Sequence, residues 1–382
     1  MTIRPEVRGI EEWLREVRRE LHKHPEPRFK ETRTAAEIAE NLHSIGLEVK
    51  TGVGGTGVVG LMRGASPGKT FAIRADMDAL PIEEETGADY ASCNPGFMHA
   101  CGHDAHMAMA LGAARALASS SELTNGQVKF VFQPGEEGGH GAREMISDGV
   151  LENPKVDTIV AAHVAPLIPF GTVGIYLREA CASADAFYIK ITGKGAHAAY
   201  PHLSQDPVLG GAQLITAIQS IVSRNTDPSR GLVISVTQFQ AGTATNVIPE
   251  EVTIAGTIRA LNEDVREHAM KRLEEMANSI CQAHDLRCQV IYGDGYPIMR
   301  NHEPISRFVA EAATEMLGED KVIIRQPKFG SEDFAYFLER CPGAGYELGC
   351  SNEVKGITNM LHTPQFDIDE DVLPLGVELY LR

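Results

Sequence analysis

Strand-like and helix-like patterns alternate along the first half of the chain, and this alternation restricts its fold more than any other feature. Apolar residues recur at helical spacing over residues 7–21 and 35–45, which predicts two amphipathic helices. Apolar runs of strand character follow at residues 57–62, 71–75, 128–132 and 158–164, separated by helical patterns near residues 105–118 and 140–147. Strands that alternate with helices indicate an α/β fold with a mostly parallel sheet flanked by helices.

The pattern changes between residues 182 and 293. There a strand, a helix, two strands, a helix and a strand are predicted in succession, at residues 187–192, 207–223, 232–239, 252–261, 264–283 and 288–292. The order β-α-β-β-α-β is the signature of a ferredoxin-like domain, which can stand alone between two halves of another domain. We therefore predict two domains, one formed by residues 1–181 and 294–382 and an inserted one at 182–293. Helices are expected from about residue 304, at 332–338 and at 371–381.

Composition excludes several classes of partner. The formal net charge is −17, from 35 basic and 52 acidic residues, without an extended basic run, so no nucleic acid is expected to bind. The long uncharged stretch at residues 158–177 contains prolines and glycines, which favours a buried strand and a turn over a membrane span. Charged residues begin at Arg4 and leave no apolar leader, which predicts a cytoplasmic protein. Seven scattered cysteines argue against a disulfide framework.

Residue types that ligate metals occur at four places, namely Cys101 with His103, Glu136 with Glu137, His163, and His362. Sulfur and nitrogen suit a borderline-soft ion such as zinc, and a carboxylate beside a ligand can take a proton from water. Each has a plainer interpretation alone: the carboxylate pair can lie at a helix N-terminus, Cys101 and His103 can form a packed turn, and His163 can be a hydrogen-bonded core histidine. Together they favour a metal centre beyond the carboxyl ends of parallel strands.

Six ordered motifs, spread over essentially the whole chain, resemble those of the metal-dependent aminoacylase and carboxypeptidase family. They are Arg74-Ala-Asp76-Met-Asp78-Ala-Leu-Pro81, Met98-His-Ala-Cys101-Gly-His103-Asp104, Gln133-Pro-Gly-Glu136-Glu137, Gly195-Ala-His197, Asn246-Val-Ile-Pro249 and Leu361-His362-Thr-Pro364. Within that family the chain is most similar to the branch of hippurate hydrolases, N-acetyl-amino-acid deacetylases and indole-3-acetyl-amino-acid hydrolases.

The resemblance implies an amidohydrolase that cleaves N-acyl-L-amino acids, such as N-acetyl or N-benzoyl compounds, to a carboxylic acid and a free amino acid. It implies two divalent metal ions per subunit, whether zinc, manganese, cobalt or nickel, with the ligands Cys101, His103, Glu137, His163 and His362. Glu136 is then the general base, which takes a proton from the attacking water and returns it to the departing amine. The larger domain is the metal-binding catalytic domain, and residues 182–293 form a lid that also joins the subunits of a homodimer or higher oligomer.

One departure from the family pattern concerns Arg74. Many relatives have a ligating histidine two residues before the aspartate equivalent to Asp76, and this chain has Arg74 there. Cys101 is expected to compensate, as in the hippurate-hydrolase branch, so that softer and harder metal ions are both acceptable. Asp76 is expected to orient a ligand or the base through a hydrogen bond, and the alternative is a simple cap at a strand end.

Three residues of the inserted domain are expected to act on the substrate. The resemblance implies that His197 donates to the oxyanion of the reaction, often from a partner subunit in relatives. Asn246 and Arg259 resemble lid residues that hold the substrate carboxylate, which a guanidinium can grip at two points. As plainer alternatives, Asn246 caps a turn and Arg259 is a solvated strand residue. Residues 330–334 either line the acyl pocket or cap a helix through Ser331.

Two other functions stay open at this stage. A dipeptidase or carboxypeptidase would use the same dinuclear site, and a requirement for a free α-amino group would reveal it. A non-catalytic binding protein on the same fold would bind metal without turnover, and the presence of Glu136 beside the five candidate ligands argues against it.

Overall fold

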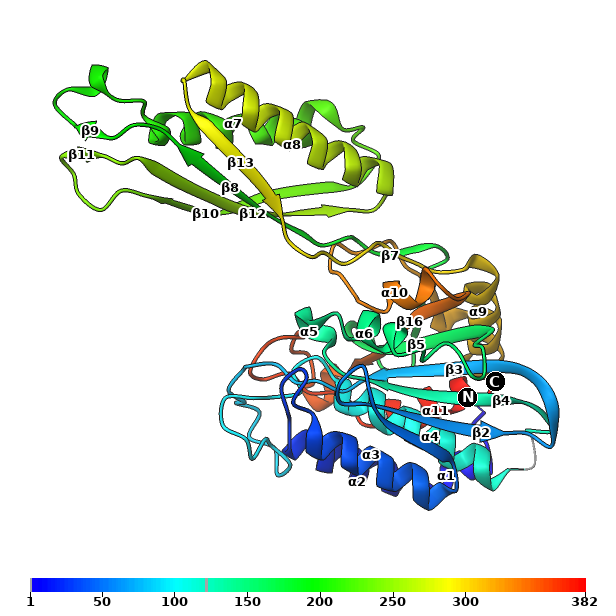
Figure 1. Ribbon diagram of the computed structural model, residues 1–382. Coiled ribbons are helices and arrows are strands. Elements are labelled where there is room, and N and C mark those ends of the chain that lie inside the picture. Colours follow the sequence, from blue (N-terminus) through cyan, green and yellow to red (C-terminus); the bar gives the residue numbers. More distant parts are fainter. Residues whose placement is uncertain (1, 121–122) are drawn as a thin grey trace. The chain divides into compact units, whose positions relative to one another are not determined.

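The computed structural model describes residues 2–120 and 123–382, which form two compact units (Figure 1). Unit 1 comprises the chain up to Ala180 together with Arg300–Gln326 and Asp333–Arg382. Unit 2 comprises Cys181–Met299 and Pro327–Glu332. Each unit has its own cluster of buried apolar side chains, as expected for units that bury separate cores.

An eight-stranded mixed sheet forms the centre of unit 1, in the order β1-β2-β4-β3-β5-β16-β6-β15. The strands are β1 (Glu48–Val53), β2 (Gly57–Arg63), β3 (Ser66–Asp76), β4 (Asn125–Gln133), β5 (Thr158–Pro169), β6 (Val173–Ile175), β15 (Val322–Ile324) and β16 (Gly343–Ser351). The four central strands β4, β3, β5 and β16 run parallel, whereas β1 and β2 pair antiparallel at one edge. The prediction of an α/β fold with a mostly parallel sheet is confirmed.

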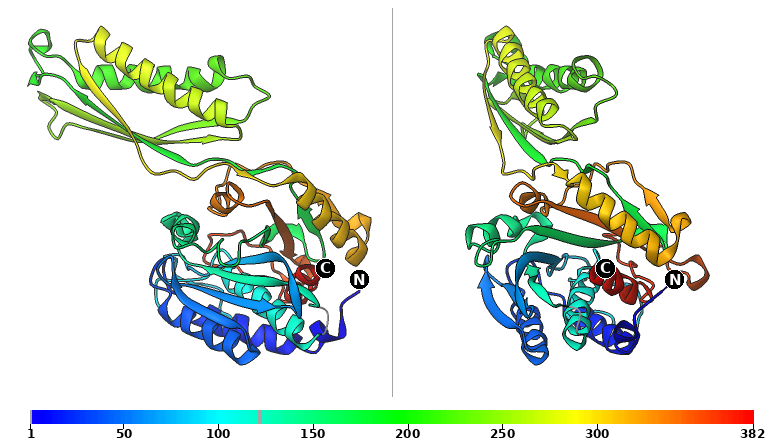
Figure 2. Two further views of the ribbon diagram at one scale, coloured as in Figure 1. Left: turned by 45° about the vertical axis from the view of Figure 1, so that its right-hand side comes forward. Right: turned by 90° about the vertical axis from the view of Figure 1, so that its right-hand side faces the viewer.

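Helices cover both faces of this sheet (Figures 1 and 2). One face carries α1 (Pro5–Arg8), α2 (Glu11–Lys23), α3 (Thr32–Ile45), α4 (His103–Ser119) and α11 (Val372–Leu381); near the other lie α5 (Glu136–Gly139), α6 (Gly141–Ser147) and α10 (Ala335–Leu338), and α9 (Glu303–Leu317) packs on β16. Helix α4 is almost wholly buried between the sheet, α2 and α11. A Cβ at Gly112 would lie 2.4 Å from Leu14 Cδ2 and 2.7 Å from Val377 Cγ2, so glycine permits this close packing.

Unit 2 is a ferredoxin-like domain, as predicted. Its elements are β8 (Asp185–Thr192), α7 (Pro207–Asn225), β10 (Leu232–Ala241), β12 (Glu251–Ala260), α8 (Glu263–Ala283) and β13 (Arg287–Tyr292). The strands form an antiparallel sheet in the order β10-β12-β8-β13, with both helices on one face. Phe187, Ile189 and Ile191 alternate with exposed Tyr188 and Lys190, which places one face of β8 against the helices.

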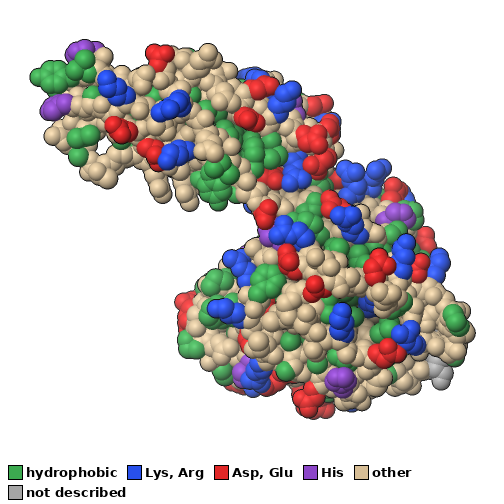
Figure 3. Space-filling view, viewed as in Figure 1, with side chains coloured by type: hydrophobic (Ala, Val, Ile, Leu, Met, Phe, Trp, Pro, Cys, Tyr) green, Lys and Arg blue, Asp and Glu red, His purple; other side chains and the backbone are tan. Residues whose placement is uncertain are grey.

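Short elements complete the chain. They are β7 (Glu179–Cys181), β9 (Ala196–His197), β11 (Val247–Ile248), β14 (Met299–Arg300) and the 3₁₀ turns Pro201–Leu203, Glu319–Lys321 and Glu353–Lys355. Acidic and basic side chains are interspersed on the face shown in Figure 3. Among the described residues, no helix combines the length and the apolar character that crossing a membrane requires.

Two details of the structure correct the sequence analysis. Strand β16 was missed although it lies inside the sheet beside β5, because Gly343, Gly345 and Gly349 weaken the strand pattern. Eight of its nine residues are buried, so burial on both faces overrides local propensity. The helix expected at 332–338 is confined to Ala335–Leu338.

Candidate metal centre

The candidate ligands lie where strands and helices of unit 1 end. Cys101 and His103 lie at the N-terminus of α4, Glu137 follows β4, and His163 is on β5. Gly102 between the first two has φ +80°, and a Cβ there would lie 2.3 Å from Val164 Cγ2. Glycine thus allows both a left-handed turn and contact between this turn and β5.

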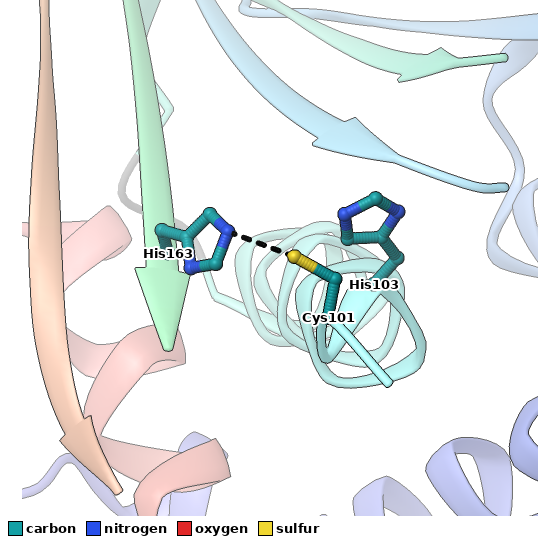
Figure 4. Close-up of side chains that lie close together, drawn as sticks. All are labelled: Cys101, His103 and His163. Atoms are coloured by element: carbon teal, nitrogen blue, oxygen red, sulfur yellow. Dashed lines mark hydrogen bonds between the residues drawn. The ribbon is translucent and has the colours of Figure 1, made fainter. Parts of the chain in front are cut away.

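The structure brings these side chains together in three overlapping groups. The groups are Cys101 with His103 and His163, His103 with Glu136 and Glu137, and Cys101 with Glu137 and His362; within each, one potential ligand atom per residue lies within 4.8 Å of the others. Figure 4 shows the first group, with Cys101 and His103 projecting from the start of α4 toward His163 on β5. Because the groups share members, five candidate ligands and Glu136 surround one small volume.

Backbone carbonyls set the orientation of two histidine rings. His103 Nδ1 donates to the Asp78 carbonyl at 2.8 Å, and His163 Nδ1 donates to the Val164 carbonyl at 2.7 Å. In its neutral form each ring therefore has its lone pair on Nε2, and His163 Nε2 lies 3.5 Å from Cys101 Sγ. His103 Nε2 is buried and accepts no hydrogen bond from the described residues. A buried nitrogen lone pair without a donor fits a metal ligand.

Glu137 and His362 complete the cluster from opposite ends of the sequence. His362 Nε2 lies 3.1 Å from Glu137 Oε1, yet the carboxylate oxygen is buried without a hydrogen bond of proper geometry from the described part of the chain. The two atoms thus converge without satisfying each other, which again fits a shared cation. His362 has φ +62°, and its backbone N–H donates to the Ala100 carbonyl at 2.8 Å, which holds this segment beside Cys101.

Asp78 organises the site, a role that sequence analysis missed. Its two carboxylate oxygens accept the backbone N–H groups of Glu136 and Glu137, each at 2.9 Å, while its carbonyl accepts from His103. One buried residue therefore connects the start of α4 to the turn after β4. Asp78 belongs to a motif quoted above, but its partners are 25 to 59 residues away, so no local pattern indicates this role.

Asp76 lies against two histidines. Its Oδ1 is 2.6 Å from His106 Nδ1, and its Oδ2 is 3.6 Å from His103 Nε2. The Val164 N–H donates to His106 Nε2 at 2.9 Å, so this nitrogen is occupied as an acceptor. His106 therefore donates to Asp76 and accepts from the backbone of β5 at the residue after His163. No local sequence pattern indicates this role.

Burial and neighbouring charges shift the ionisation of the cluster in the chain without metal. Burial raises the pKa of the Cys101 thiol to about 12. Burial alone would lower the pKa of His103, but Asp76, Cys101 and Asp78 together outweigh burial and raise that pKa well above its usual value. Both groups are therefore protonated at neutral pH, and metal binding must displace these protons.

The three predicted lid residues lie in unit 2 at two separate places. His197 on β9 pairs with Val247 on β11, and the Asn246 carbonyl accepts from the Ala198 N–H at 3.0 Å, so His197 and Asn246 are neighbours on an exposed tip. Arg259 lies near the far end of β12, eight residues beyond Glu251, which corresponds to roughly 26 Å at about 3.3 Å per residue. Unit 2 therefore does not bring Arg259 to the tip.

Comparison with known proteins identifies the family. The family described as "Peptidase family M20/M25/M40" matches residues 72–382 of the chain. "Thermostable carboxypeptidase 1" of Saccharolobus solfataricus is 40% identical over 378 residues, covering 98% of this chain and 95% of the relative. "N-acetyl-L-cysteine deacetylase" of Bacillus subtilis is 40% identical over 364 residues, covering 95% and 85%. The crystal structure of a dinuclear metal-binding M20 peptidase from Bacillus subtilis has a TM-score of 0.86 and 32% identity, covering 98% of this chain and 97% of that one.

The fold, the convergent cysteine, histidine and glutamate side chains and these matches define a metal-dependent hydrolase of amide bonds. The chain belongs to the peptidase family M20/M25/M40. The resemblance stated from the motifs and the prediction of an enzyme are thereby confirmed. The roles of individual site residues and the division at residues 182–293 stay predictions.

Proposed function

We propose that this protein hydrolyses N-acyl-L-amino acids to a carboxylic acid and a free amino acid. The observation that supports this most directly is the set of three overlapping ligand groups around Cys101, His103 and Glu137, with Glu136 at their edge. The relative named as an N-acetyl-L-cysteine deacetylase supports an acyl group on the substrate nitrogen. We place this chemistry in the cytoplasm.

The residues present fit two divalent ions. Cys101, His103, Glu137, His163 and His362 would hold them, and zinc, manganese, cobalt and nickel all accept such a mixed donor set. When bound, the ions would supply Lewis acidity to the amide carbonyl and would lower the pKa of a water molecule toward roughly 7.

Glu136 is proposed as the general base. Its carboxylate takes a proton from the attacking water and later delivers it to the amine nitrogen, so that the amino acid leaves in a protonated form. Asp78 holds the Glu136 backbone N–H at 2.9 Å, and the Glu136 side chain is buried, which keeps the base directed at the cluster. Asp76 is proposed to orient His103 electrostatically and to hold His106.

The inserted unit is proposed as a lid and dimerisation domain. His197 would donate to the developing oxyanion, and Asn246 and Arg259 would bind the substrate carboxylate. Because His197 and Asn246 lie far from Arg259 within the unit, we propose that one substrate receives these residues from two subunits.

A second candidate function is cleavage of dipeptides or peptide C-termini at the same site. The relative named "Thermostable carboxypeptidase 1" favours it, since it matches nearly the whole chain. The chemistry at the amide is identical, and the two functions differ only in whether the acyl side carries a free α-amino group.

Amino acid release from a panel of N-acetyl, N-benzoyl and N-indoleacetyl amino acids and free dipeptides tests both functions. We expect chelation to abolish release and added zinc, manganese, cobalt or nickel to restore it with the N-acyl compounds. Release from dipeptides alone would assign the peptidase function instead. Metal binding without any release would contradict both.

Replacing Arg259 with Ala is expected to raise KM about 10- to 100-fold for substrates with a free carboxylate, because a charge-assisted hydrogen bond is lost. Ile258 and Ala260 pack in the core with the helices, so Arg259 between them lies on the opposite face of the sheet, and its Nη1 donates to Thr257 and to the Ile258 carbonyl at 3.2 Å. Substrates whose carboxylate is blocked as an amide should be unaffected. Arg230→Ala, which removes an exposed arginine paired with Asp264, is the matched control. Equal losses on both substrate types would reject the carboxylate contact.

A further inference from the structure

Arg74 is a buried cation directly behind the candidate metal centre. Its side chain is only 2% exposed and lies in the interior of the sheet on β3. Nη1 donates to Asp76 Oδ2 at 2.7 Å, Nε donates to Gln133 Oε1 at 2.7 Å, and Nη2 donates to Asp333 Oδ1 at 3.0 Å. A buried guanidinium is costly unless its donors are matched in this way, so these contacts determine where its partners lie.

Asp333 is the second centre of this network. Gln133 Nε2 donates to both of its carboxylate oxygens at 2.8 Å, and the Ala142 N–H at the start of α6 donates to Oδ2 at 3.0 Å. The side chain is fully buried. Three polar groups from β3, β4 and α6 therefore hold one aspartate that comes from a distant part of the sequence.

Asp333 also touches the proposed base. Its backbone N–H donates to Glu136 Oε1 at 3.3 Å, in a buried contact. Glu136 is thus held at its backbone by Asp78 and at its carboxylate by Asp333. The Asp78 contact determines the path of the chain, whereas the Asp333 contact acts on an atom that would transfer the proton.

The other end of the network reaches the ligands. Arg74 fixes Asp76, Asp76 is 2.6 Å from His106, and His106 accepts from the Val164 N–H next to His163. Arg74 therefore connects Asp333, which contacts Glu136, with Asp76 and His106, which hold β5. Burial alone would raise the pKa of the Asp76 carboxyl, but Arg74, His103 and His106 together lower that pKa well below its usual value.

We propose that Arg74, Gln133 and Asp333 are positioning residues that hold the Glu136 carboxylate in register with the metal ligands. The inference rests on the proposed function, because it concerns the base of that reaction. A carboxylate that rotates away from the water loses rate without losing substrate binding, since proton transfer requires hydrogen-bond distance. At its Asp333 end, which contacts Glu136, the network is thus predicted to act on kcat and to leave KM and metal binding nearly unchanged.

Asp333→Asn is the central test, because it keeps the shape of the side chain and removes its charge. We expect kcat to fall about 10- to 100-fold, the range typical of residues that support a metal site, with KM within about twofold of wild type. Gln133→Met and Arg74→Lys should also lower kcat. Gln133→Met is useful because it introduces no buried charge. In Asp333→Asn and Gln133→Met, metal stoichiometry and the absorption spectrum of the cobalt-loaded protein should match those of wild type.

A second background separates positioning from general disturbance of the fold. In a Glu136→Gln protein the base is absent, so adding Asp333→Asn should not lower the residual kcat further. Lys129→Met is the matched control. Lys129 is a buried cation on β4, the strand that also carries Gln133. Its Nζ donates to the carbonyls of Val150, Glu152 and Pro154 and not to the network. This control should lower the melting temperature and leave kcat unchanged.

Three results would overturn the proposal. They are an unchanged kcat in Asp333→Asn, an equal fall of kcat in both backgrounds, or a changed cobalt spectrum that accounts for the loss. Failure of the proposed function is distinguishable, because the wild-type protein would then release no amino acid from any substrate of the panel.

Discussion

Glu136→Gln is expected to lower kcat by about 10²- to 10⁴-fold, the contribution typical of a general base. The glutamine side chain has nearly the same shape but cannot accept the proton of the attacking water. Asp78 bonds the backbone of residue 136 rather than its side chain, so the turn after β4 should persist. Metal content and melting temperature should therefore equal those of wild type. Steady-state kinetics and metal analysis of the same preparations measure both quantities.

Glu144→Gln serves as the control for this substitution. Glu144 is exposed on α6, a few residues after the site, and its Oε1 contacts only neighbouring Arg143 among the ion pairs of the described chain. It should retain wild-type kcat. Full turnover by the Glu136 variant would remove Glu136 from the role of base, and loss of bound metal would make it a ligand instead.

Arg18→Met is expected to destabilise the folded protein by about 3–5 kcal/mol, because it leaves the buried Asp104 carboxylate without its arginine partner. Arg18 is fully buried on α2; its Nε donates to Asp104 Oδ2 at 2.7 Å and its Nη2 donates to Asp367 Oδ1 at 2.8 Å. Asp104 is the residue after His103, so this ion pair also anchors the start of α4. Urea unfolding at neutral pH measures the difference.

Arg19→Met offers a control on the same helix, since both arginines contact Glu370, with Arg18 Nη1 at 3.4 Å from its Oε1. Arg19 Nη2 lies 2.6 Å from Glu370 Oε2, but its side chain is 45% exposed, so its loss should cost less than about 1 kcal/mol. Equal effects of the two substitutions would contradict the argument from burial.

The effect of Arg18 should also depend on pH. Burial alone would raise the pKa of Asp104, but Arg18, with His22 and His99, outweighs burial and depresses that pKa far below its usual value. A carboxyl with a depressed folded-state pKa stabilises the protein above the unfolded-state pKa of about 3.9, and this stability is lost as the pH falls below that value. The difference in stability between wild type and Arg18→Met should therefore be full at neutral pH and shrink in acid.

Local patterns were sufficient for much of the fold. The β-α-β-β-α-β order of unit 2 was predicted, and α7, α8 and α9 lie within a few residues of their predicted ranges. Amphipathic helices carry their periodicity in the sequence itself, since one face must be apolar. Strand β16 carries no such pattern, because it is buried on both faces and contains three glycines.

The types and order of the candidate ligands were also readable from the sequence. Cys101, His103, Glu137, His163 and His362 were named from residue chemistry and family motifs, and the structure gathers them around one volume. A metal requires particular donor atoms, so the residue type carries the information.

Only the tertiary structure decided which residues hold that cluster in place. Asp78, His106, Arg74 and Asp333 act through hydrogen bonds to partners up to 259 residues away, and several of these bonds go to backbone groups that look alike in every sequence. Burial gives these bonds their strength, because an unmatched charge or donor in the interior is costly. The sequence by itself thus determined the chemistry that the site can offer, whereas packing across the sheet determined how that chemistry is oriented.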